Sequence, residues 1–296
     1  MTATISDTPS AASTPDGADP AAIARRVRGA PLVVMLDVDG TLCDITPTPD
    51  EAAVPQETRD ILDALVHEPN VYVAILTGRS LSDANRLAPV PGIHVYANHG
   101  VELVRADGTK DVDRAADEAS LAVRSAAATL TRVVATTAGA LLEDKGYTLS
   151  VHYRNTPPED VARLCDTVRD VGARTGLEVT TGHHVIELRP PGARHKGGAV
   201  QHLLDDLGHD LSNAALFFAG DDLSDEDAFR VLRDMPNATT VAVGGRVPTS
   251  AAQFRLPNPA ATRALLRTLL EQARAGAYLP AKAIQSDDLH EIGYRQ

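Results

Sequence analysis

One ten-residue stretch constrains the fold of this chain more than any other. The apolar run Val33-Val34-Met35-Leu36 ends abruptly in Asp37-Val38-Asp39-Gly40-Thr41-Leu42. Such a run is apolar on both faces, which is typical of a buried strand in a parallel sheet. The two carboxylates would then lie at the carboxyl end of the strand, where open α/β sheets bind ligands. A divalent cation would suit this pair, although an acidic surface turn or a calcium loop has the same local pattern.

Two further apolar runs also end in residues that suit phosphate chemistry. Residues 71–76 precede Thr77-Gly78-Arg79, and residues 214–219 precede Gly220-Asp221-Asp222-Leu223-Ser224-Asp225. Lys196 opens a predicted helix just before the second of these runs. Because parallel strands bring their carboxyl ends to one edge of a sheet, we expect these residues to converge on Asp37 and Asp39.

Each of these residue types has a role in phosphoryl transfer. Asp37, at the tip of the strand, can attack phosphorus, and Asp39 can protonate the leaving alkoxide and then activate water. The Thr77 hydroxyl and the Lys196 ammonium can hold non-bridging phosphate oxygens. Clustered carboxylates without histidine or cysteine in their motifs favour Mg²⁺ over zinc. The candidate metal ligands are Asp37, Asp39, Asp221, Asp222 and Asp225.

The middle of the chain changes character between about residues 108 and 193. Long helices are predicted from Asp113 to about Thr137 and from Pro158 to about Thr175, each followed by a predicted hairpin. Polar and apolar residues alternate in both hairpins, which is typical of an antiparallel sheet with one face covered by helices. The other face would hydrogen-bond to sugar hydroxyls or simply be solvated, and it carries Ser150, His152, Arg154, Glu187 and Arg189.

This order of elements predicts an α/β fold in two lobes. We expect a doubly wound, mostly parallel core built from residues 29–107 and 194–280, with an inserted α+β cap at residues 108–193. Residues 1–28 are rich in Ala, Thr, Ser and Pro and read as a disordered tail, and residues 281–296 read as a polar tail.

Composition limits the partners. A net charge of −12 argues against nucleic acid or an anionic membrane, so a small molecule held by a few local cations is expected. The sequence has no long apolar run and no signal-peptide pattern at its N-terminus. Two cysteines, Cys43 and Cys165, suit a reducing cytoplasm. A monomer is the working expectation.

The four motifs resemble those of the haloacid dehalogenase superfamily of phosphotransferases. Within it, the chain is similar to the trehalose-6-phosphate phosphatase family. That narrower resemblance rests on Asn98-His99-Gly100-Val101-Glu102, Glu143-Asp144-Lys145, Ser150-Val151-His152-Tyr153-Arg154 and Glu187-Leu188-Arg189-Pro190. The αββαββ order of the insertion resembles the larger sugar-phosphatase cap of the superfamily.

The resemblance implies roles for individual residues. Asp37 would be the nucleophile and Asp39 the acid and base, with Mg²⁺ on the Asp37 side chain, the Asp39 carbonyl and Asp221, supported by Asp225. Members often carry a lysine where this chain has His183, and often a serine where it has Thr77. The expected substrate-binding residues are Gly78, Arg79, Asn98, His99, Glu102, Lys145, His152, Arg154 and Glu187.

The leading prediction is therefore Mg²⁺-dependent hydrolysis of trehalose 6-phosphate to trehalose and phosphate through an aspartyl-phosphate. One alternative keeps the chemistry and changes the substrate, to sucrose phosphate or a mannosyl-glycerate phosphate. Another is a non-catalytic module that docks a trehalose-phosphate synthase. That alternative requires a broken motif, and all four motifs are intact.

Overall fold

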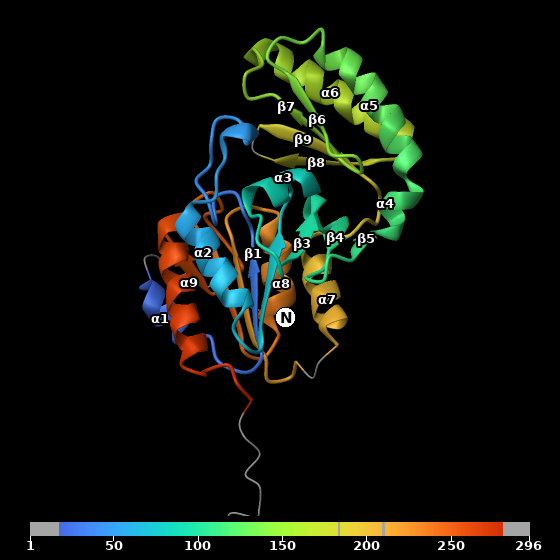
Figure 1. Cartoon of the computed structure of the whole chain (residues 1–296). Helices are drawn as coiled ribbons and strands as arrows, with labels where there is room; N and C mark the ends of the chain where they lie inside the picture. The colour runs from blue at the N-terminus through green and yellow to red at the C-terminus, as the bar shows by residue number, and fades with distance from the viewer. Residues whose placement is uncertain (1–17, 183, 209–210, 281–296) are drawn as a thin grey trace, which may run out of the picture.

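A mixed, mostly parallel sheet forms the centre of the larger lobe in the computed structural model, which describes residues 18–182, 184–208 and 211–280 (Figure 1). In this part of the chain the order is β12-β11-β10-β1-β2-β3-β4-β5, parallel from β12 to β3 and antiparallel from there to β5. The predicted doubly wound core is confirmed. Its strands are β1 (Leu32–Leu36), β2 (Val71–Leu76), β3 (His94–Ala97), β4 (Glu102–Val104), β5 (Lys110–Val112), β10 (Ala215–Gly220), β11 (Ala238–Val243) and β12 (Phe254–Leu256).

Helices cover both faces of this sheet. Successive residues of β1 point to opposite faces, so that Val34 packs in one apolar cluster and Val33 in the other. The first face is covered by α1 (Pro20–Ala24), α2 (Gln56–Val66), α3 (Leu81–Leu87) and α9 (Pro259–Arg274). The second face is covered by α7 (Lys196–Leu207) and α8 (Asp225–Arg233). Two 3₁₀ turns lie in the loops, η1 (Pro49–Glu51) and η2 (Asn98–Gly100).

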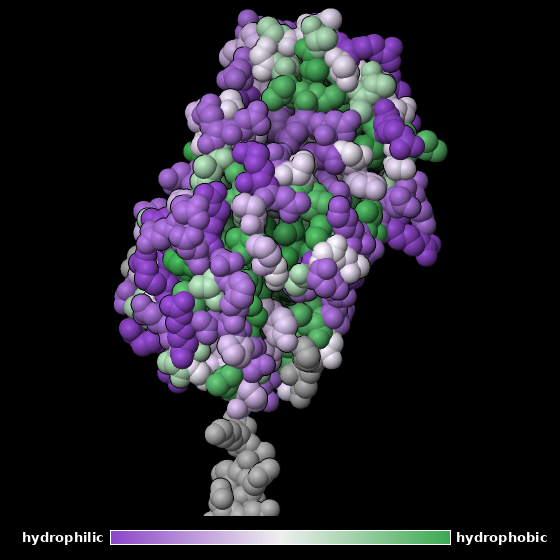
Figure 2. Space-filling model, viewed as in Figure 1, coloured by the Kyte–Doolittle hydropathy of each residue, from purple (hydrophilic) through white to green (hydrophobic). Residues whose placement is uncertain are grey.

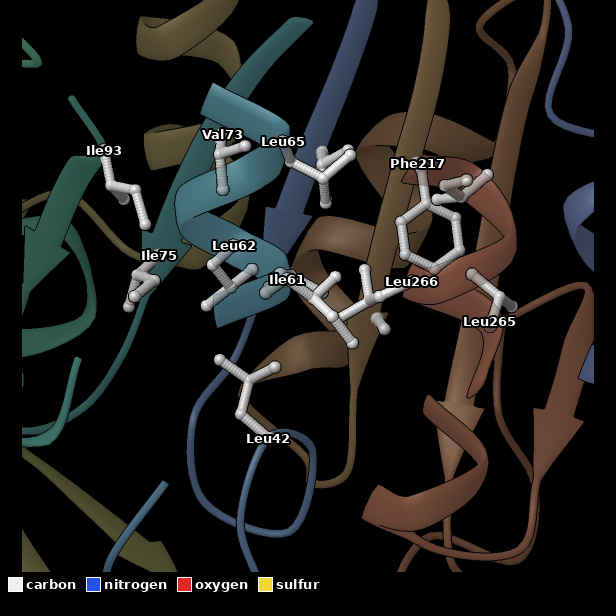
Figure 3. Close-up of a cluster of buried hydrophobic side chains, with 14 of the residues drawn as sticks. Leu42, Ile61, Leu62, Leu65, Val73, Ile75, Ile93, Phe217, Leu265 and Leu266 are labelled. Atoms are coloured by element: carbon white, nitrogen blue, oxygen red, sulfur yellow. The ribbon is translucent and has the colours of Figure 1, made fainter. Parts of the chain in front are cut away.

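The packing of α2 and α9 on the sheet follows from their amphipathic patterns. Ile61, Leu62 and Leu65 share one side of α2 and meet Leu266 of α9 over the sheet (Figure 3). Burying each such side chain stabilises the fold by roughly 1.5–3 kcal/mol. Figure 2 shows mostly hydrophilic side chains over the outer surfaces of these two helices.

The smaller lobe, called the cap below, consists of a four-stranded antiparallel sheet in the order β6-β7-β9-β8 with helices on its far side (Figure 1). Leu149, Val151, Ile186 and Leu188 pack against the helices, so the predicted alternation in both hairpins is confirmed. The elements of the cap are α4 (Arg114–Glu118), α5 (Ser120–Val134), β6 (Leu141–Asp144), β7 (Leu149–His152), α6 (Pro158–Thr175), β8 (Glu178–Gly182) and β9 (Val185–Arg189).

The two connections between the lobes run side by side. The N–H of Asp113 donates to the carbonyl of Val101 at 2.7 Å, and the Arg194 guanidinium donates to the carbonyl of Gly100 at 3.0 Å. Arg194 and Asp113 also form an ion pair at 3.8 Å. The chain therefore enters and leaves the cap at one place.

The structure corrects two sequence-based expectations and leads us to propose a different boundary for the cap. Residues 18–28 are not a tail, because α1 buries Ile23 and Ala24 against the sheet. The expected helix at 113–137 is divided at Ala119 into α4 and α5. A cap boundary at residue 108 would separate β5 from the core strand β4 that it pairs with, so we propose that the cap begins near Asp113.

Several expectations lie outside the described residues, namely those on residues 1–17, 183 and 281–296. None of the helices in the described ranges combines the length and the hydropathy that crossing a bilayer requires.

Candidate active site

Asp37 lies at the carboxyl end of β1, between β10 and β2. Its N–H donates to the carbonyl of Ala219 at 3.0 Å, and its side chain is buried. The chain turns just beyond it at Gly40, which has φ +75°. A β-carbon at Gly40 would lie 2.2 Å from a carboxylate oxygen of Asp221, so only glycine lets these two segments approach so closely.

Lys196 joins two of the buried carboxylates. Its ammonium donates to Asp37 and to Asp225, at 2.7 Å each. The other oxygen of Asp225 accepts the N–H groups of Asp221 and Asp222 at 2.9 and 3.0 Å. Burial alone would lower the pKa of Lys196, but Asp225 and Asp37 raise it well above its ordinary value. Lys196 is therefore a fixed positive charge at the centre of the site.

The remaining charge of the cluster calls for a cation. Asp37, Asp221 and Asp225 can each bring one carboxylate oxygen within 4.8 Å of the others. Burial and neighbouring carboxylates raise the pKa of Asp221 to about 7, and burial raises that of Asp37 despite Lys196. Oxygen ligands of this kind suit a hard divalent cation, which would relieve the repulsion.

Asp39 is held apart from that cluster by Arg79. The guanidinium donates to both carboxylate oxygens of Asp39 at 2.7 Å, and a third donor reaches the carbonyl of Pro49 at 2.8 Å. Such a two-point pair fixes the plane of the carboxylate as well as its location. Arg79 therefore orients Asp39 and ties down the loop that carries Pro49.

The loop after β3 places a histidine under the cap. Asn98 and His99 both have left-handed backbones, with φ of +49° and +60°. The His99 ring then covers Gly78 so closely that a β-carbon there would lie 2.4 Å from it. Strained non-glycine residues of this kind persist only where the surroundings enforce them.

Asn98 connects the core to the cap and is held by Glu102. The buried Asn98 amide donates to Glu102 and to the carbonyl of Lys145, and it accepts the Thr148 hydroxyl at 3.0 Å. Thr77 is also buried, and its hydroxyl accepts the N–H of Arg79 at 3.2 Å. These side chains support the walls of the site.

On the cap side, Glu187 is the centre of a polar network. It accepts the Ser150 hydroxyl at 2.7 Å, and Lys145 and His99 lie 3.5 and 3.6 Å away. Burial would raise the pKa of Glu187, but His99, Lys145 and Ser150 hold it well below its usual range. Lys145 also donates to the carbonyl of Gly78 at 2.9 Å, so it crosses from the cap to the core.

A second pair, Glu143 and His152, lies beside this network, with Oε2 of Glu143 and Nε2 of His152 2.9 Å apart. Burial would raise the pKa of Glu143, but the bond from His152 and the nearby Lys145 lower it. Glu143 therefore remains an anionic acceptor at the edge of the cleft.

These groups line one cleft between the core and the cap. Predicted residues in its wall are Asp37, Asp39, Gly78, Arg79, His99, Lys145, His152, Glu187, Lys196, Asp221 and Asp222. Sequence reasoning did not place four others there, namely Pro49, Glu143, Ser224 and Arg246. Among the described residues, the predicted Thr77, Asn98, Glu102 and Asp225 lie behind the wall, and Arg154 lines an adjoining cleft.

Of the four added residues, Glu143 could have been found from the sequence, since it belongs to a motif that carries the resemblance. Arg246 follows two glycines in a loop, and no sequence motif points to it.

A family model described as trehalose-phosphatase matches residues 35–259, which include both sides of the cleft. The chain belongs to this family. The trehalose-phosphate phosphatase of Mycobacterium tuberculosis is 36% identical over 247 residues, which are 81% of this chain and 62% of that protein. An uncharacterized glycosyl hydrolase of the same species is 38% identical over 241 residues, only 18% of its own length.

The chain thus spans less than two thirds of the length of these family relatives. Among solved structures, a trehalose-6-phosphate phosphatase related protein is similar with a TM-score of 0.71 and 23% identity, covering 82% of this chain and 99% of that one. At that identity the likeness concerns the fold, and it extends over core and cap together.

Proposed function

We propose that the protein hydrolyses trehalose 6-phosphate to trehalose and inorganic phosphate. One observation carries the proposal: in a chain of the trehalose-phosphatase family, a single cleft unites Asp37, Asp39 and Lys196 with the cap residues Lys145 and Glu187. The core side offers phosphoryl-transfer groups, and the cap side offers donors and acceptors for sugar hydroxyls.

The first step belongs to Asp37. An oxygen of its carboxylate attacks phosphorus, the bond from phosphorus to the sugar oxygen breaks, and an aspartyl-phosphate forms. The buried ammonium of Lys196, 2.7 Å from Asp37, favours the ionised nucleophile against the opposing effect of burial, and it balances charge on the phosphoryl oxygens.

The second group is Asp39, which transfers the proton. As an acid it protonates the leaving sugar alkoxide, and as a base it then takes a proton from the water that hydrolyses the aspartyl-phosphate. Each oxygen of Asp39 accepts one bond from Arg79 and keeps a second lone pair on which it can carry this proton.

Mg²⁺ fits the carboxylates of Asp37 and Asp221, with Asp225 behind them, and when bound it would supply positive charge for the phosphoryl group. On the cap, we propose that Glu187, Lys145, His152 and Glu143 bind the sugar. Asn98 and Glu102 would act by holding the cap in place. Both cysteines are free thiols, and the cytoplasm remains the expected compartment.

The test is phosphate release from a panel of sugar phosphates, each with Mg²⁺ and with EDTA. We expect trehalose 6-phosphate to give the highest kcat/KM and EDTA to abolish it. A preference for sucrose phosphate or a mannosyl-glycerate phosphate would retain the chemistry and replace the substrate. No release from any of them, by folded protein with Mg²⁺, would favour the non-catalytic docking module.

A further inference from the structure

The loop that follows β11 brings one more charge to the site. β11 is parallel to β10, so the two strands end at the same edge of the sheet. The chain turns after β11 at Gly244, which has φ +67°, and Arg246 follows two residues later. The loop therefore places the guanidinium of Arg246 beside Asp221. Arg246 lies outside all four sequence motifs.

Arg246 is bound to a carboxylate of the candidate metal cluster. Its Nη1 donates to Oδ2 of Asp221 at 2.9 Å. The Asp221 side chain is only 4% exposed, whereas that of Arg246 is 35% exposed. Lys196, the other cation of this cluster, is 2% exposed and holds two carboxylates at once. Arg246 is thus the positive charge that can leave the cluster without unpacking the core.

We infer that Arg246 and the divalent cation compete for Asp221, so that the arginine substitutes for the metal in the metal-free protein and moves away when the metal binds. The inference rests on the proposed metal site. Two positive groups on one carboxylate repel each other, and the repulsion is strong where water is largely excluded. A cation bound by Asp37 and Asp221 therefore disfavours the guanidinium at Asp221.

The surroundings of Arg246 give the displaced side chain a place to go. Arg246 lines both the cleft of the candidate site and the adjoining cleft, whose wall includes Thr46, Leu141 and Asn155. A long side chain on an exposed loop can turn from one cleft to the other by changing its rotamer.

The inference has two measurable consequences. Arg246 stabilises the metal-free site, because it offsets repulsion among the buried carboxylates. It also weakens metal binding, because the ion must displace it. Removing the charge should therefore lower the melting temperature without metal and tighten the binding of Mg²⁺.

The experiment is calorimetric titration of Mg²⁺ into the full chain. We expect Arg246→Gln to bind Mg²⁺ about two- to fivefold more tightly than wild type, which is the range for a partly exposed ion pair. Arg246→Lys keeps the charge and should stay near wild type. Arg267→Gln is the matched control, since it removes the same charge from an ion pair between Arg267 on α9 and Glu57 on α2. Without metal, Arg246→Gln should melt at a lower temperature than wild type. This difference in melting temperature should vanish at saturating Mg²⁺.

A second measurement follows the wild-type protein and needs a variant only to assign one signal. The NMR signal of the Arg246 Nε–H, assigned by its absence in Arg246→Lys, should shift as Mg²⁺ saturates the site. An unmoved signal, or equal or weaker Mg²⁺ binding by Arg246→Gln, would overturn the inference and leave the proposed function intact. If wild type binds no Mg²⁺, the proposed metal site fails as well, and the two failures are distinguishable.

Discussion

Three of the acidic residues at the candidate site are each paired with a different basic residue. Lys196 holds Asp37, Arg79 holds Asp39, and Arg246 holds Asp221. The partners differ in exposure, from 2% for the Lys196 side chain to 35% for that of Arg246. A fully buried pair is permanent, whereas a half-exposed pair can exchange. The exposure of the basic partner therefore separates pairs that hold the site together from a pair that can break when a ligand binds.

The assignment of Asp37 as nucleophile predicts that Asp37→Asn abolishes turnover, because an amide cannot form the acyl phosphate. The fold should persist, since burial disfavours the charge of Asp37 and Lys196 keeps its bond to Asp225. The measurements are phosphate release and the melting temperature. Wild-type turnover by the folded variant would show that another residue attacks phosphorus.

The assignment of Glu187 to the sugar predicts a loss that depends on the substrate. Hydrogen bonds to charged groups contribute roughly 1.5–3 kcal/mol. Glu187→Ala should therefore lose about tenfold to a hundredfold in kcat/KM for trehalose 6-phosphate. Hydrolysis of p-nitrophenyl phosphate, which cannot use the sugar contact, should barely change.

Glu178→Ala is the matched control for this comparison, because Glu178 is exposed on β8 of the same sheet. It should leave both substrates unaffected. An equal fractional loss on both substrates for Glu187→Ala would mean that Glu187 maintains the structure of the cleft, and the assignment to the sugar would be abandoned.

At the scale of elements, the strands that end in the motifs were predictable and the short strands were not. β1, β2 and β10 are apolar on both faces, and their ends carry the acidic and hydroxyl residues. β4, β5 and β12 have three residues each, too few to show a period, and pairing with neighbours determines them.

Sequence patterns also had limited reach at the candidate site. Residues within recognisable motifs were predicted, but the direction in which each side chain points was not. Asn98, whose backbone is left-handed, donates to Glu102 and reaches the cap at Lys145 and Thr148, which no sequence pattern indicated. Arg246 reaches Asp221 only because β10 and β11 lie side by side.

The packing of α9 on the sheet predicts the effect of a core truncation. Leu266 is fully buried, and Leu266→Ala should destabilise the protein by about 2–5 kcal/mol through lost transfer free energy and a residual cavity. Urea denaturation measures this as a lower midpoint. Leu121→Ala on α5 is the control, since Leu121 is 72% exposed and its truncation should change stability by no more than about 0.5 kcal/mol. Equal effects would refute the assignment of Leu266 to the core.

At the scale of the whole molecule, the metal links the site to global stability. A ligand that binds only the native state stabilises it by about 2.7 kcal/mol at a hundred times its dissociation constant. Mg²⁺ should therefore raise the melting temperature of wild type and not that of Asp221→Ala, compared at matched ionic strength in NaCl. An equal rise with NaCl, or an equal rise in the variant, would argue against specific binding at Asp221.

The side-by-side connections at Asp113 and Arg194 have a consequence for how such proteins diversify. A lobe whose entry and exit are neighbours can be exchanged as a cassette, because its replacement need only bridge the same short gap. The register of the core sheet, and with it the spacing of Asp37, Asp39 and Asp221, would be unchanged by the exchange. On the proposed function, a changed cap could alter the substrate while the core residues that carry out the reaction stay in place.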